Sequence, residues 1–513
     1  MRLNILIGGK AGQGLNELAS ILARAISAAG YYSFNYRDYG SWIAGGPNFN
    51  ILCVSDKRTG SFDKELDIVV ALDDKTLDLH KKEFKKNSIL LTEKNVSIEN
   101  EKIRNMYFAG ALFKILGLDK KFLLLEVDKK FKGKSLYDED VKAVNSSYDN
   151  YSGMSLKLKS GKSKEVMNGT EAVVNSSLDS GLNVYLGYPM TPTTGVLTML
   201  AQKQKTGNHF VFEPENEIAV ANMALGASFA GSKVMIGSSG GGFDLMTEAL
   251  SAQGIMELPL VVHLGQRGSN STGVPTYTGQ GSLKTALYGG NGEFARVVIA
   301  PGDAKEAYDK TREAFYFSEK YNCLSILLTD KHLLESDYSF DNFEKSKLKV
   351  PERKIDLGKK LVRATSYEHT KEGHTTEDPE EIYQSIKKRV VEKTLRIKEE
   401  AKKFEMYKIY GKGKTLIVSY GSNKGAILDA IDNIKDVSYL HIMYLSPFPK
   451  EIIKHLEQAK KVLLLECDAT GQLAKLIRAK TGFDIPQKDR ILKYDARPFQ
   501  PEEILSELKT RLK

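Results

Sequence analysis

Cysteine is scarce in this chain of 513 residues. The three cysteines, Cys53, Cys323 and Cys467, lie far apart, and no Cys-x-x-Cys pair occurs. A local framework for an iron–sulfur cluster or a structural zinc ion is therefore excluded for this chain. Free thiols without a disulfide pattern indicate a reducing compartment, so we expect a cytoplasmic protein.

Long apolar runs are also missing. No run reaches the roughly 18–20 residues that a membrane helix needs, and residues 1–9 turn glycine-rich too early for a signal peptide. The formal net charge is +9, but basic and acidic residues are interspersed along the chain. No basic patch is interleaved with stacking aromatic residues, so we expect neither a membrane nor a nucleic acid as partner. A mild positive field would attract an acidic small molecule or an acidic protein.

What is present is the composition of a soluble globular protein, with 41% hydrophobic and 27% charged residues. The length suggests three domains of about 100–200 residues each. The chain opens with an apolar strand over 3–7, a glycine turn, and small and apolar residues at helical spacing over 15–29, which is the start of an α/β unit. Further buried strands over 66–72 and 88–92 favour a parallel sheet covered by helices.

A polar, lysine-rich linker over 152–164 separates this part from a second α/β region, which reaches from about residue 169 to 334. The next part, 335–412, is charged and poor in apolar residues, and we interpret it as a surface connector with one long helix over 379–404. The last part again has apolar strands, over 415–419 and 462–466. In the second region we expect strands over 183–186, 233–237, 258–265, 296–299 and 323–329, and helices over 217–229, 243–256 and 305–320.

The glycine turn at residues 8–14 has two interpretations. Gly12 and Gly14 form a Gly-x-Gly pair whose backbone could approach a phosphate. The dinucleotide fingerprint needs a third glycine where this chain has Glu17, so the signal for NAD is weak. The same glycines could instead permit a tight turn and close packing. A second small-residue loop, 44–48, could approach a ligand or end a strand.

Residues 188–194 read Tyr-Pro-Met-Thr-Pro-Thr-Thr and follow an expected strand. The two prolines fix the backbone and leave the threonines on a rigid turn that can present hydroxyl and N–H groups to a carbonyl or carboxylate. Alternatively, the turn is an ordinary helix N-terminus, with Thr191 as cap and Pro192 in the first position. Both interpretations can hold together.

Two charged residues stand out downstream. Glu217 begins an expected helix of unusually small residues, so its carboxylate would be partly buried and would need a partner, for which a cofactor nitrogen is one option. Acids also occur in first helical turns because the helix dipole favours them. Arg267 stands alone in a loop of Gly, Ser and Thr, where it could clamp a substrate carboxylate or bond the loop carbonyls.

Together these segments resemble the fused gamma–alpha subunit of the 2-oxoacid:ferredoxin oxidoreductases, which include pyruvate and 2-oxoglutarate enzymes. The family's Tyr-Pro-Ile-Thr-Pro-Ser-Ser is similar to 188–194, its Glu-Asp-Glu-Ile-Ala to 215–219, and its Gln-Arg-x-Gly-Pro-Ser-Thr-Gly-x-Pro-Thr to 266–276. Residues 368–373 resemble its Glu-His-x-x-x-Gly connector, and Gln472 lies in its Gly-Gln-Leu motif. The resemblance implies a gamma-type domain over 1–153, a pyrimidine-type thiamine diphosphate domain over 165–334, a connector over 335–412 and a transketolase C-terminal-like domain over 413–513.

The resemblance also implies roles for single residues. Thr191 would contact the substrate, Arg267 would bind its carboxylate, and Thr276 would lie near the pocket. Glu217 would pair with the pyrimidine ring of thiamine diphosphate. The expected substrate-binding set is Tyr188, Pro189, Thr191, Pro192, Arg267 and Thr276; the expected cofactor-binding set is Glu217, Gly12, Gly14, Gly45 and Gly46.

The implied reaction is the coenzyme A-dependent oxidative decarboxylation of a 2-oxoacid to acyl-CoA and CO₂, with electrons passed to ferredoxin. The family's Gly-Asp-Gly…Asn motif for diphosphate and Mg²⁺ and the cysteines of its [4Fe–4S] cluster are missing here. The resemblance therefore implies a beta subunit that carries both, in a dimer of heterodimers. The alternative is a non-catalytic scaffold or regulatory subunit. Departures at 240–242, 269–270 and Ala44 leave substrate identity and the coenzyme A contacts open.

Overall fold

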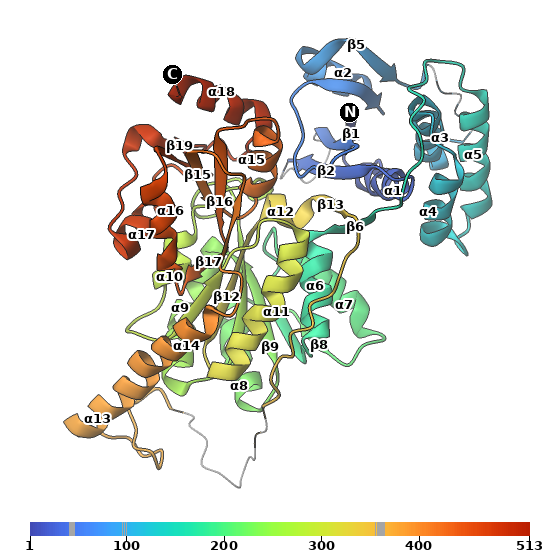
Figure 1. Ribbon diagram of the computed structural model, residues 1–513. Helices are drawn as coiled ribbons and strands as arrows, with labels where there is room; N and C mark the ends of the chain where they lie inside the picture. The colour runs from blue at the N-terminus through green and yellow to red at the C-terminus, as the bar shows by residue number, and fades with distance from the viewer. Residues whose placement is uncertain are drawn as a thin grey trace.

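The computed structural model describes residues 1–40, 47–94, 96, 98, 100–353, 355 and 365–512. Three β-sheets of seven, seven and five strands, each packed against helices, make up the molecule (Figure 1). The predicted α/β class is confirmed. Among the described residues, no helix is long and apolar enough to cross a membrane.

The first sheet has the strand order β5-β4-β1-β3-β2-β13-β6. Strand β1 runs parallel to β4 but antiparallel to β3, so the expectation of a parallel sheet is wrong for this half. The reason is that β2 and β3 are consecutive strands with too short a connection for a helical crossover, which leaves only the antiparallel arrangement. The strands are β1 (Arg2–Lys10), β2 (Tyr32–Tyr39), β3 (Pro47–Ser55), β4 (Leu66–Ala71), β5 (Phe84–Leu91), β6 (Glu165–Asn168) and β13 (Asp337–Phe340).

The helices of this N-terminal part pack on one another and on the sheet through a continuous apolar core. The strand expected over 88–92 is present as β5, but only Leu91 in it is buried, because β5 is an edge strand. The polar segment 152–164 lies against the helices, since Leu156 N–H donates to the Ile115 carbonyl. The helices are α1 (Leu15–Ala28), α2 (Asp74–His80), η1 (Lys81–Glu83), η2 (Glu101–Ile103), α3 (Arg104–Leu116), α4 (Lys121–Phe131) and α5 (Tyr137–Asn150).

Two strands of the first sheet come from outside the expected gamma-type region. Strand β6 follows the linker, and β13 lies within the expected connector; they pair with each other, and β13 also pairs with β2. All four residues of β13 are buried, so the interpretation of this stretch as surface chain is wrong. We therefore propose the domain division predicted from the sequence, with these two short strands reassigned to the first sheet.

The second sheet has the order β17-β11-β12-β10-β9-β7-β8, and all of its strands are parallel except β17. Strand β11 and helix α8 have the predicted bounds, and the other expected elements lie within three residues of the prediction. The elements are α6 (Gly169–Asp179), β7 (Val184–Gly187), α7 (Thr194–Gln204), β8 (Phe210–Phe212), α8 (Glu217–Phe229), β9 (Val234–Ser239), α9 (Gly240–Met256), β10 (Leu260–Gln266), α10 (Leu283–Tyr288), β11 (Arg296–Ile299), α11 (Ala304–Tyr321), β12 (Leu324–Asp330) and α12 (Lys331–Glu335).

The third sheet has the order β14-β16-β15-β18-β19 and packs beside the second, to which the C-terminal part also contributes β17. The helix expected over 379–404 is present as α13 (Pro379–Ile386), a π-helical turn η3 (Lys387–Glu392) and α14 (Lys393–Ala401), with α13 at its outer end (Figure 1). The remaining elements are β14 (Tyr407–Tyr410), β15 (Thr415–Tyr420), α15 (Asn423–Ile431), β16 (Val437–Ile442), β17 (Tyr444–Ser446), η4 (Lys450–Ile452), α16 (Ile453–Gln458), β18 (Lys461–Glu466), α17 (Gln472–Thr481), η5 (Gln487–Asp489), β19 (Arg490–Leu492) and α18 (Pro501–Arg511).

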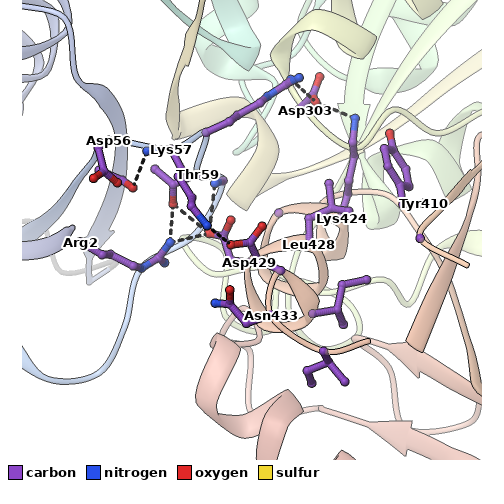
Figure 2. A pocket seen from close by; sticks show the side chains of 18 of the residues that line it. Arg2, Asp56, Lys57, Thr59, Asp303, Tyr410, Lys424, Leu428, Asp429 and Asn433 are labelled. Atoms are coloured by element: carbon purple, nitrogen blue, oxygen red, sulfur yellow. Dashed lines mark hydrogen bonds and ion pairs between the residues drawn. The ribbon is translucent and has the colours of Figure 1, made fainter. Parts of the chain in front are cut away.

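The N-terminal and C-terminal parts meet beside a cavity of about 690 Å³ (Figure 2). One carboxylate oxygen of Asp429, on α15, accepts hydrogen bonds from Arg2 Nη1 at 2.9 Å and Thr59 Oγ1 at 2.8 Å. The Gly60 amide at 3.2 Å and Ser61 Oγ at 2.5 Å donate to the same oxygen. Four donors from the first part thus converge on one acceptor of the third, so Asp429 joins the two.

We predict that Asp429→Ala lowers the free energy of unfolding by about 2–3 kcal/mol, because Arg2 would remain partly buried without this partner. The side chain of Asp429 is only 8% exposed. Urea denaturation of the purified chain measures the change.

The control is Asp432→Ala in the same helix-terminal region, where the carboxylate is 49% exposed and pairs with the exposed Lys57. This change should alter stability by less than about 0.5 kcal/mol. Equal losses in the two variants would show that Asp429 has no special role at the junction.

Candidate functional site

Four neighbouring parallel strands end at the same edge of the second sheet. The turn 188–194 follows β7, the glycine loop of α9 follows β9, the Arg267 loop follows β10, and Glu217 follows β8 by a few residues. Ligands of open α/β sheets bind at the carboxyl ends of the strands. The sheet therefore gathers the predicted segments in the place where such a fold binds small molecules.

The turn 188–194 packs against the start of the Arg267 loop. The Thr191–Pro192 peptide bond is cis, and Pro192 is buried. A Cβ atom on Gly265 would lie 2.8 Å from Pro192 Cγ, so the turn and β10 approach as closely as only glycine permits. Helix α7 begins after Thr193, so the alternative in which Thr191 caps the helix is wrong. Thr191 stands before the helix, and its carbonyl accepts a hydrogen bond from Arg267 Nη1 at 3.3 Å.

Glu217 is the first residue of α8 and is 5% exposed. Asn216 caps the helix by accepting a hydrogen bond from the Ala219 amide, which leaves the Glu217 side chain free of a capping role. Within the described part of the chain, its carboxylate makes no hydrogen bond. A Cβ atom on Gly242 would lie 2.5 Å from Glu217 Oε1 and would also meet Ser238 Oγ. The glycine loop of α9 therefore forms a cradle that fits this carboxylate.

Buried polar atoms without partners gather around Glu217 and Arg267. Within the described residues, Ser238 Oγ, Ser239 Oγ, Arg267 Nε and Thr276 Oγ1 have no hydrogen-bond partner. Buried polar groups are normally paired, and each orphan requires an explanation. Their concentration at one sheet edge indicates a site built to receive polar groups of a ligand.

Arg267 is 7% exposed and bonds weakly to the protein. Its second contact is the Ser271 carbonyl, at 3.4 Å. Burial lowers the pKa of the guanidinium, and the nearby Glu217 carboxylate opposes that shift. Arg267 therefore donates to loop carbonyls, which is the structural role that the sequence also allowed. The unpartnered Nε and the long distances leave the guanidinium able to bind a carboxylate as well.

The loop after Arg267 is conformationally strained. Ser269, Ser271 and Gly273 all have positive φ angles, of 67°, 54° and 49°. This conformation costs free energy for the two serines, whereas glycine adopts it freely, and strained residues cluster at ligand sites. The loop borders a cleft of about 930 Å³, whose opposite wall comes from the C-terminal part. The lining residues are Gly240, Gly241, Asp244, Arg267–Ser271, Gly273, Val274, Thr278–Ser282, Thr285, Cys467–Thr470, Gln472 and Lys493–Arg497.

The predicted substrate residues are only partly brought to this cleft. Of these residues, all within the described chain, Arg267 alone lines it. Thr191 adjoins it through its bond to Arg267, and Thr276 is buried in the same loop. Tyr188 is exposed, and Pro189 borders a separate hollow of about 460 Å³ beside Phe212.

Gly12 and Gly14, two of the predicted cofactor-binding glycines of the N-terminal part, do not line this cleft. Gly12 and Gly14 have positive φ angles, of 89° and 72°, and Gly14 precedes α1. The turn is closed by its own bonds, since the Lys10 amide donates to Gln13 Oε1. Gly45 and Gly46 lie outside the described residues, as does Ala44. A cofactor role for these four glycines stays a prediction.

Gln280 is a residue that sequence reasoning did not select. It is 1% exposed and connects the second region to the third sheet: its Nε2 donates to the Tyr420 carbonyl at 3.0 Å, and its Oε1 accepts from the Cys467 amide at 2.8 Å. Gln472 makes a second bridge, donating to the Gly281 carbonyl and accepting from the Lys284 amide. In the sequence, the pair Gln280-Gly281 was the feature that could have pointed to this contact.

Two family models match the chain. The model described as "Pyruvate flavodoxin/ferredoxin oxidoreductase, thiamine diP-bdg" matches residues 175–405, and the one described as "Pyruvate ferredoxin/flavodoxin oxidoreductase" matches residues 4–98. The first match includes every segment gathered at the carboxyl edge of the second sheet.

Curated relatives agree with these models. The "2-oxoacid:ferredoxin oxidoreductase subunit alpha" of Sulfolobus sp. is 29% identical, over 98% of this chain and 96% of the relative. The "2-oxoglutarate synthase subunit KorA" of Methanocaldococcus jannaschii is 31% identical, over 60% of this chain and 89% of the relative. This chain belongs to the alpha subunits of the 2-oxoacid:ferredoxin oxidoreductase family. It is thus a subunit of an oxidoreductase, as the resemblance implied.

A solved structure has the same fold over the whole chain. It is the 2-oxoglutarate:ferredoxin oxidoreductase from Magnetococcus marinus, with a TM-score of 0.87, 22% identity and 100% coverage of both chains. The arrangement of three sheets is therefore that of a known member of this class.

We predict that Gly242→Ala destabilises the chain by about 1–3 kcal/mol, because the added methyl group would overlap Glu217 and Ser238. Helix α8 offers a matched control in Gly226, where an added Cβ would meet no atom within 4 Å. Gly226→Ala should stabilise the chain by about 0.5–1 kcal/mol. Chemical denaturation measures both; a neutral Gly242→Ala would contradict the cradle.

Proposed function

We propose that this chain supplies the pyrimidine side and the substrate pocket of an enzyme that oxidatively decarboxylates a 2-oxoacid. The products are acyl-CoA and CO₂, and the electrons pass to ferredoxin. The observation that carries the proposal is the buried Glu217 carboxylate, which has no hydrogen-bond partner in the described chain and lies in the field of Arg267. A buried carboxylate needs a partner, and a ring nitrogen of a bound cofactor would be one.

The residues present fit thiamine diphosphate. Glu217, whose carboxylate lies in the cradle over Gly242, would hold a nitrogen of the pyrimidine ring. The hydroxyls of Ser238 and Ser239, which have no partner within the described residues, are also at this edge of the sheet. When bound, the cofactor supplies the carbon nucleophile and the electron sink for decarboxylation. The contribution of this chain is to fix the ring and to bind the substrate.

Arg267 would pair with the substrate carboxylate. Thr191 and Thr276 would orient its oxygens, since the Thr191 carbonyl bonds Arg267 and the buried hydroxyl of Thr276 has no partner among the described residues. Burial of these groups strengthens their electrostatic interactions and removes water from the reacting centre. An arginine recognises the carboxylate shared by all 2-oxoacids, so it does not select among their side chains.

The rest of the active site would come from a beta subunit that holds the diphosphate, Mg²⁺ and a [4Fe–4S] cluster. The sequence has no Gly-Asp-Gly…Asn motif, and its cysteines are all buried and separate from one another. The curated relatives are alpha subunits by name, which supports an assembly of several subunits. We propose two such heterodimers per complex, acting in the cytoplasm.

The beta subunit would cover the outer face of α8 and α9. Helix α8 is rich in apolar and small residues on all sides, and helices of this kind are buried all round. Yet Ile218, Met223 and Leu245 are exposed on these two helices, and the aromatic rings of Phe210 and Phe212 are exposed on the adjoining edge strand. Clustered exposed apolar residues mark an interface. Its position next to Glu217 suits a partner that completes the cofactor site.

The proposal that coenzyme A is a co-substrate is supported by family membership and by the Magnetococcus protein. That protein is described with 2-oxoglutarate, coenzyme A and succinyl-CoA bound. The 930 Å³ cleft beside Arg267 is large enough for more than a small 2-oxoacid, since small-molecule sites of 300–1,000 Å³ commonly enclose drug-sized ligands.

We predict that Glu217→Gln in the reconstituted complex leaves folding and assembly intact but lowers kcat at least about a hundredfold, because the neutral amide cannot replace the carboxylate at the ring nitrogen. Viologen reduction with a panel of 2-oxoacids and coenzyme A measures the rate. Turnover near the wild-type rate in an assembled complex would refute the assignment of Glu217.

We predict that Leu245→Asp weakens assembly with the beta subunit at least about tenfold, because a carboxylate would be placed in a dry interface. Leu245 is 53% exposed in the isolated chain, so the change should not affect folding. Leu125→Asp on α4 is the control, with a similar exposure of 54%. Analytical ultracentrifugation of the mixed subunits measures assembly; equal affinities for both variants would place the interface elsewhere.

A further inference from the structure

The Arg267 loop, residues 267–276, is called the substrate loop below. It is closed at its far end by Tyr277, which follows Thr276. The Gly268 amide donates to the Tyr277 carbonyl at 3.1 Å, and the Tyr277 amide donates to the Val274 carbonyl at 3.2 Å. Gly268 comes directly after Arg267, so the position of Tyr277 determines where the loop that carries Arg267 and Thr276 begins and ends. If the loop binds substrate as proposed, the contacts that fix the Tyr277 side chain therefore affect substrate binding.

Arg497, from the C-terminal part, lies over the ring of Tyr277. Its guanidinium carbon is 3.6 Å from the ring centroid, which is a close stacking contact. Its side chain is 42% exposed and is held from another direction by Asp38, whose Oδ2 lies 3.3 Å from Arg497 Nε. Arg497 thus links a residue of the substrate loop to a carboxylate of the first sheet.

Asp38 is itself fixed. It is buried near the end of β2, and Tyr36 Oη donates to its Oδ2 at 2.8 Å. The Tyr36 ring is stacked on Phe62 at 4.6 Å between centroids. The carboxylate that faces Arg497 is therefore part of the packed N-terminal part and not a mobile surface group.

The residue before Arg497 contacts the other end of the same loop. Ala496 has a φ angle of 62°, which is uncommon for a residue with a side chain. A Cβ on Gly268 would lie 2.6 Å from the Ala496 Cβ. The Arg497 amide donates to Asp495 Oδ1 at 2.9 Å, which closes this turn. Adjacent residues 496 and 497 therefore touch both Gly268 and Tyr277.

We propose that Arg497 is a positioning residue for substrate binding. It stacks on Tyr277, Asp38 holds it in place, and together they keep the Arg267 loop in its binding shape. This inference rests on the proposed function, in which that loop binds the 2-oxoacid carboxylate. Asp38 of the first sheet and Arg497 of the C-terminal part then both act on Tyr277, which lies in the loop after strand β10 of the second sheet.

A direct role for Arg497 in binding the substrate is the main competing idea, because Arg497 also lines the cleft. The face of its guanidinium is covered by Tyr277 and its Nε faces Asp38, so its action through the loop is better supported. Burial, with the nearby Asp38 carboxylate, raises the pKa of Tyr277, so the ring stays a neutral phenol that the cation can stack on.

The experiment compares Arg497→Met, Arg497→Lys and Asp38→Asn in the complex with the beta subunit, with pyruvate and with 2-oxoglutarate. Arg497→Met should raise KM for both substrates about tenfold and change kcat less than about twofold, because the loop loses its preset shape but no reacting group is lost. Arg497→Lys should restore part of the affinity. Asp38→Asn should raise KM in the same direction, because Asp38 faces Arg497 and also interacts with Tyr277. The double variant should raise KM by less than the product of the two single effects, because the three side chains form one coupled cluster.

A direct substrate contact predicts a different result. In that case Asp38→Asn would leave KM unchanged while Arg497→Met raised it, and the inference would be overturned. A rise in KM for 2-oxoglutarate alone would also overturn it, since the loop serves the carboxylate that both substrates share.

A second readout does not depend on catalysis. In the isolated chain, the amides of Gly268 and Tyr277 should exchange with deuterium at least about fivefold faster in Arg497→Met than in the wild type. The control is Arg478→Met, in the same C-terminal part, where the side chain is 69% exposed and pairs with Asp484 at 3.5 Å. Unchanged exchange in Arg497→Met would refute the inference. If the wild-type complex oxidises no 2-oxoacid, the proposed function fails, whereas the exchange result still tests the contact.

Discussion

The arrangement of this site depends on one electrostatic constraint: the buried carboxylate of Glu217 has no hydrogen-bond partner among the residues that the structure describes. Burying a charge is costly unless it is paired, and Glu217 is buried in a cradle that admits no side chain at Gly242. Arg267 lies nearby and is itself buried, and its Nε has no partner within the described part of the chain. Two incompletely paired opposite charges can persist there because the folding of a large α/β sheet supplies the free energy and because a ligand can complete both.

The rest of the structure holds these two groups in place. Parallel strands bring four loops to one edge, the cis-Pro192 turn packs on Gly265, and the third sheet is docked through Gln280. The first sheet reaches the same loop through Asp38 and Arg497. All of these contacts lie within the chain itself, so the half-site that we propose would be preorganised, and preorganisation is what makes electrostatic stabilisation effective.

The outer face of the proposed half-site is where we propose that a partner subunit binds. Helix α8 carries Glu217 on its buried side and Ile218 and Met223 on its exposed side. An apolar helix with one face in water is stable only while the rest of its surface is well packed, and a partner on that face would bury it. The same helix would then connect cofactor binding to subunit association.

Much of this could be predicted from the sequence. The bounds of α8 followed from its small residues between Glu217 and Phe229, and the neighbouring strands followed from apolar runs bounded by glycine. The short strands β6 and β13 could not be predicted, because four mixed residues carry no periodic signal and their partners lie far away in the chain. The antiparallel β2–β3 pair was missed because β2 mixes aromatic residues with Ser, Asn, Arg and Asp, so neither strand stood out as an apolar run.

At the site, local patterns identified Glu217, Arg267 and the turn at 188–194, since each is unusual within its own segment. The stacking of Arg497 on Tyr277 joins residues that are far apart in sequence, and the orphan hydroxyls of Ser238 and Ser239 are recognised only by what surrounds them. Long-range contacts of this kind leave no trace in composition or spacing. The glycine turn at Gly12 and Gly14 shows that a clear local pattern can be structural, since Gly14 precedes α1 and the Lys10 amide closes the turn; its cofactor role stays a prediction.

The central claim is that this chain forms one half of a thiamine diphosphate site. Isothermal titration of thiamine diphosphate with Mg²⁺ into the isolated chain, the isolated beta subunit and the assembled complex tests it most directly. We expect tight, stoichiometric binding of thiamine diphosphate to the complex and markedly weaker binding to either subunit alone. When Glu217 is replaced by glutamine, most of the increase in affinity that assembly brings should be lost. Equally tight binding to this chain alone, or a complex that binds the cofactor equally well without the Glu217 carboxylate, would contradict it.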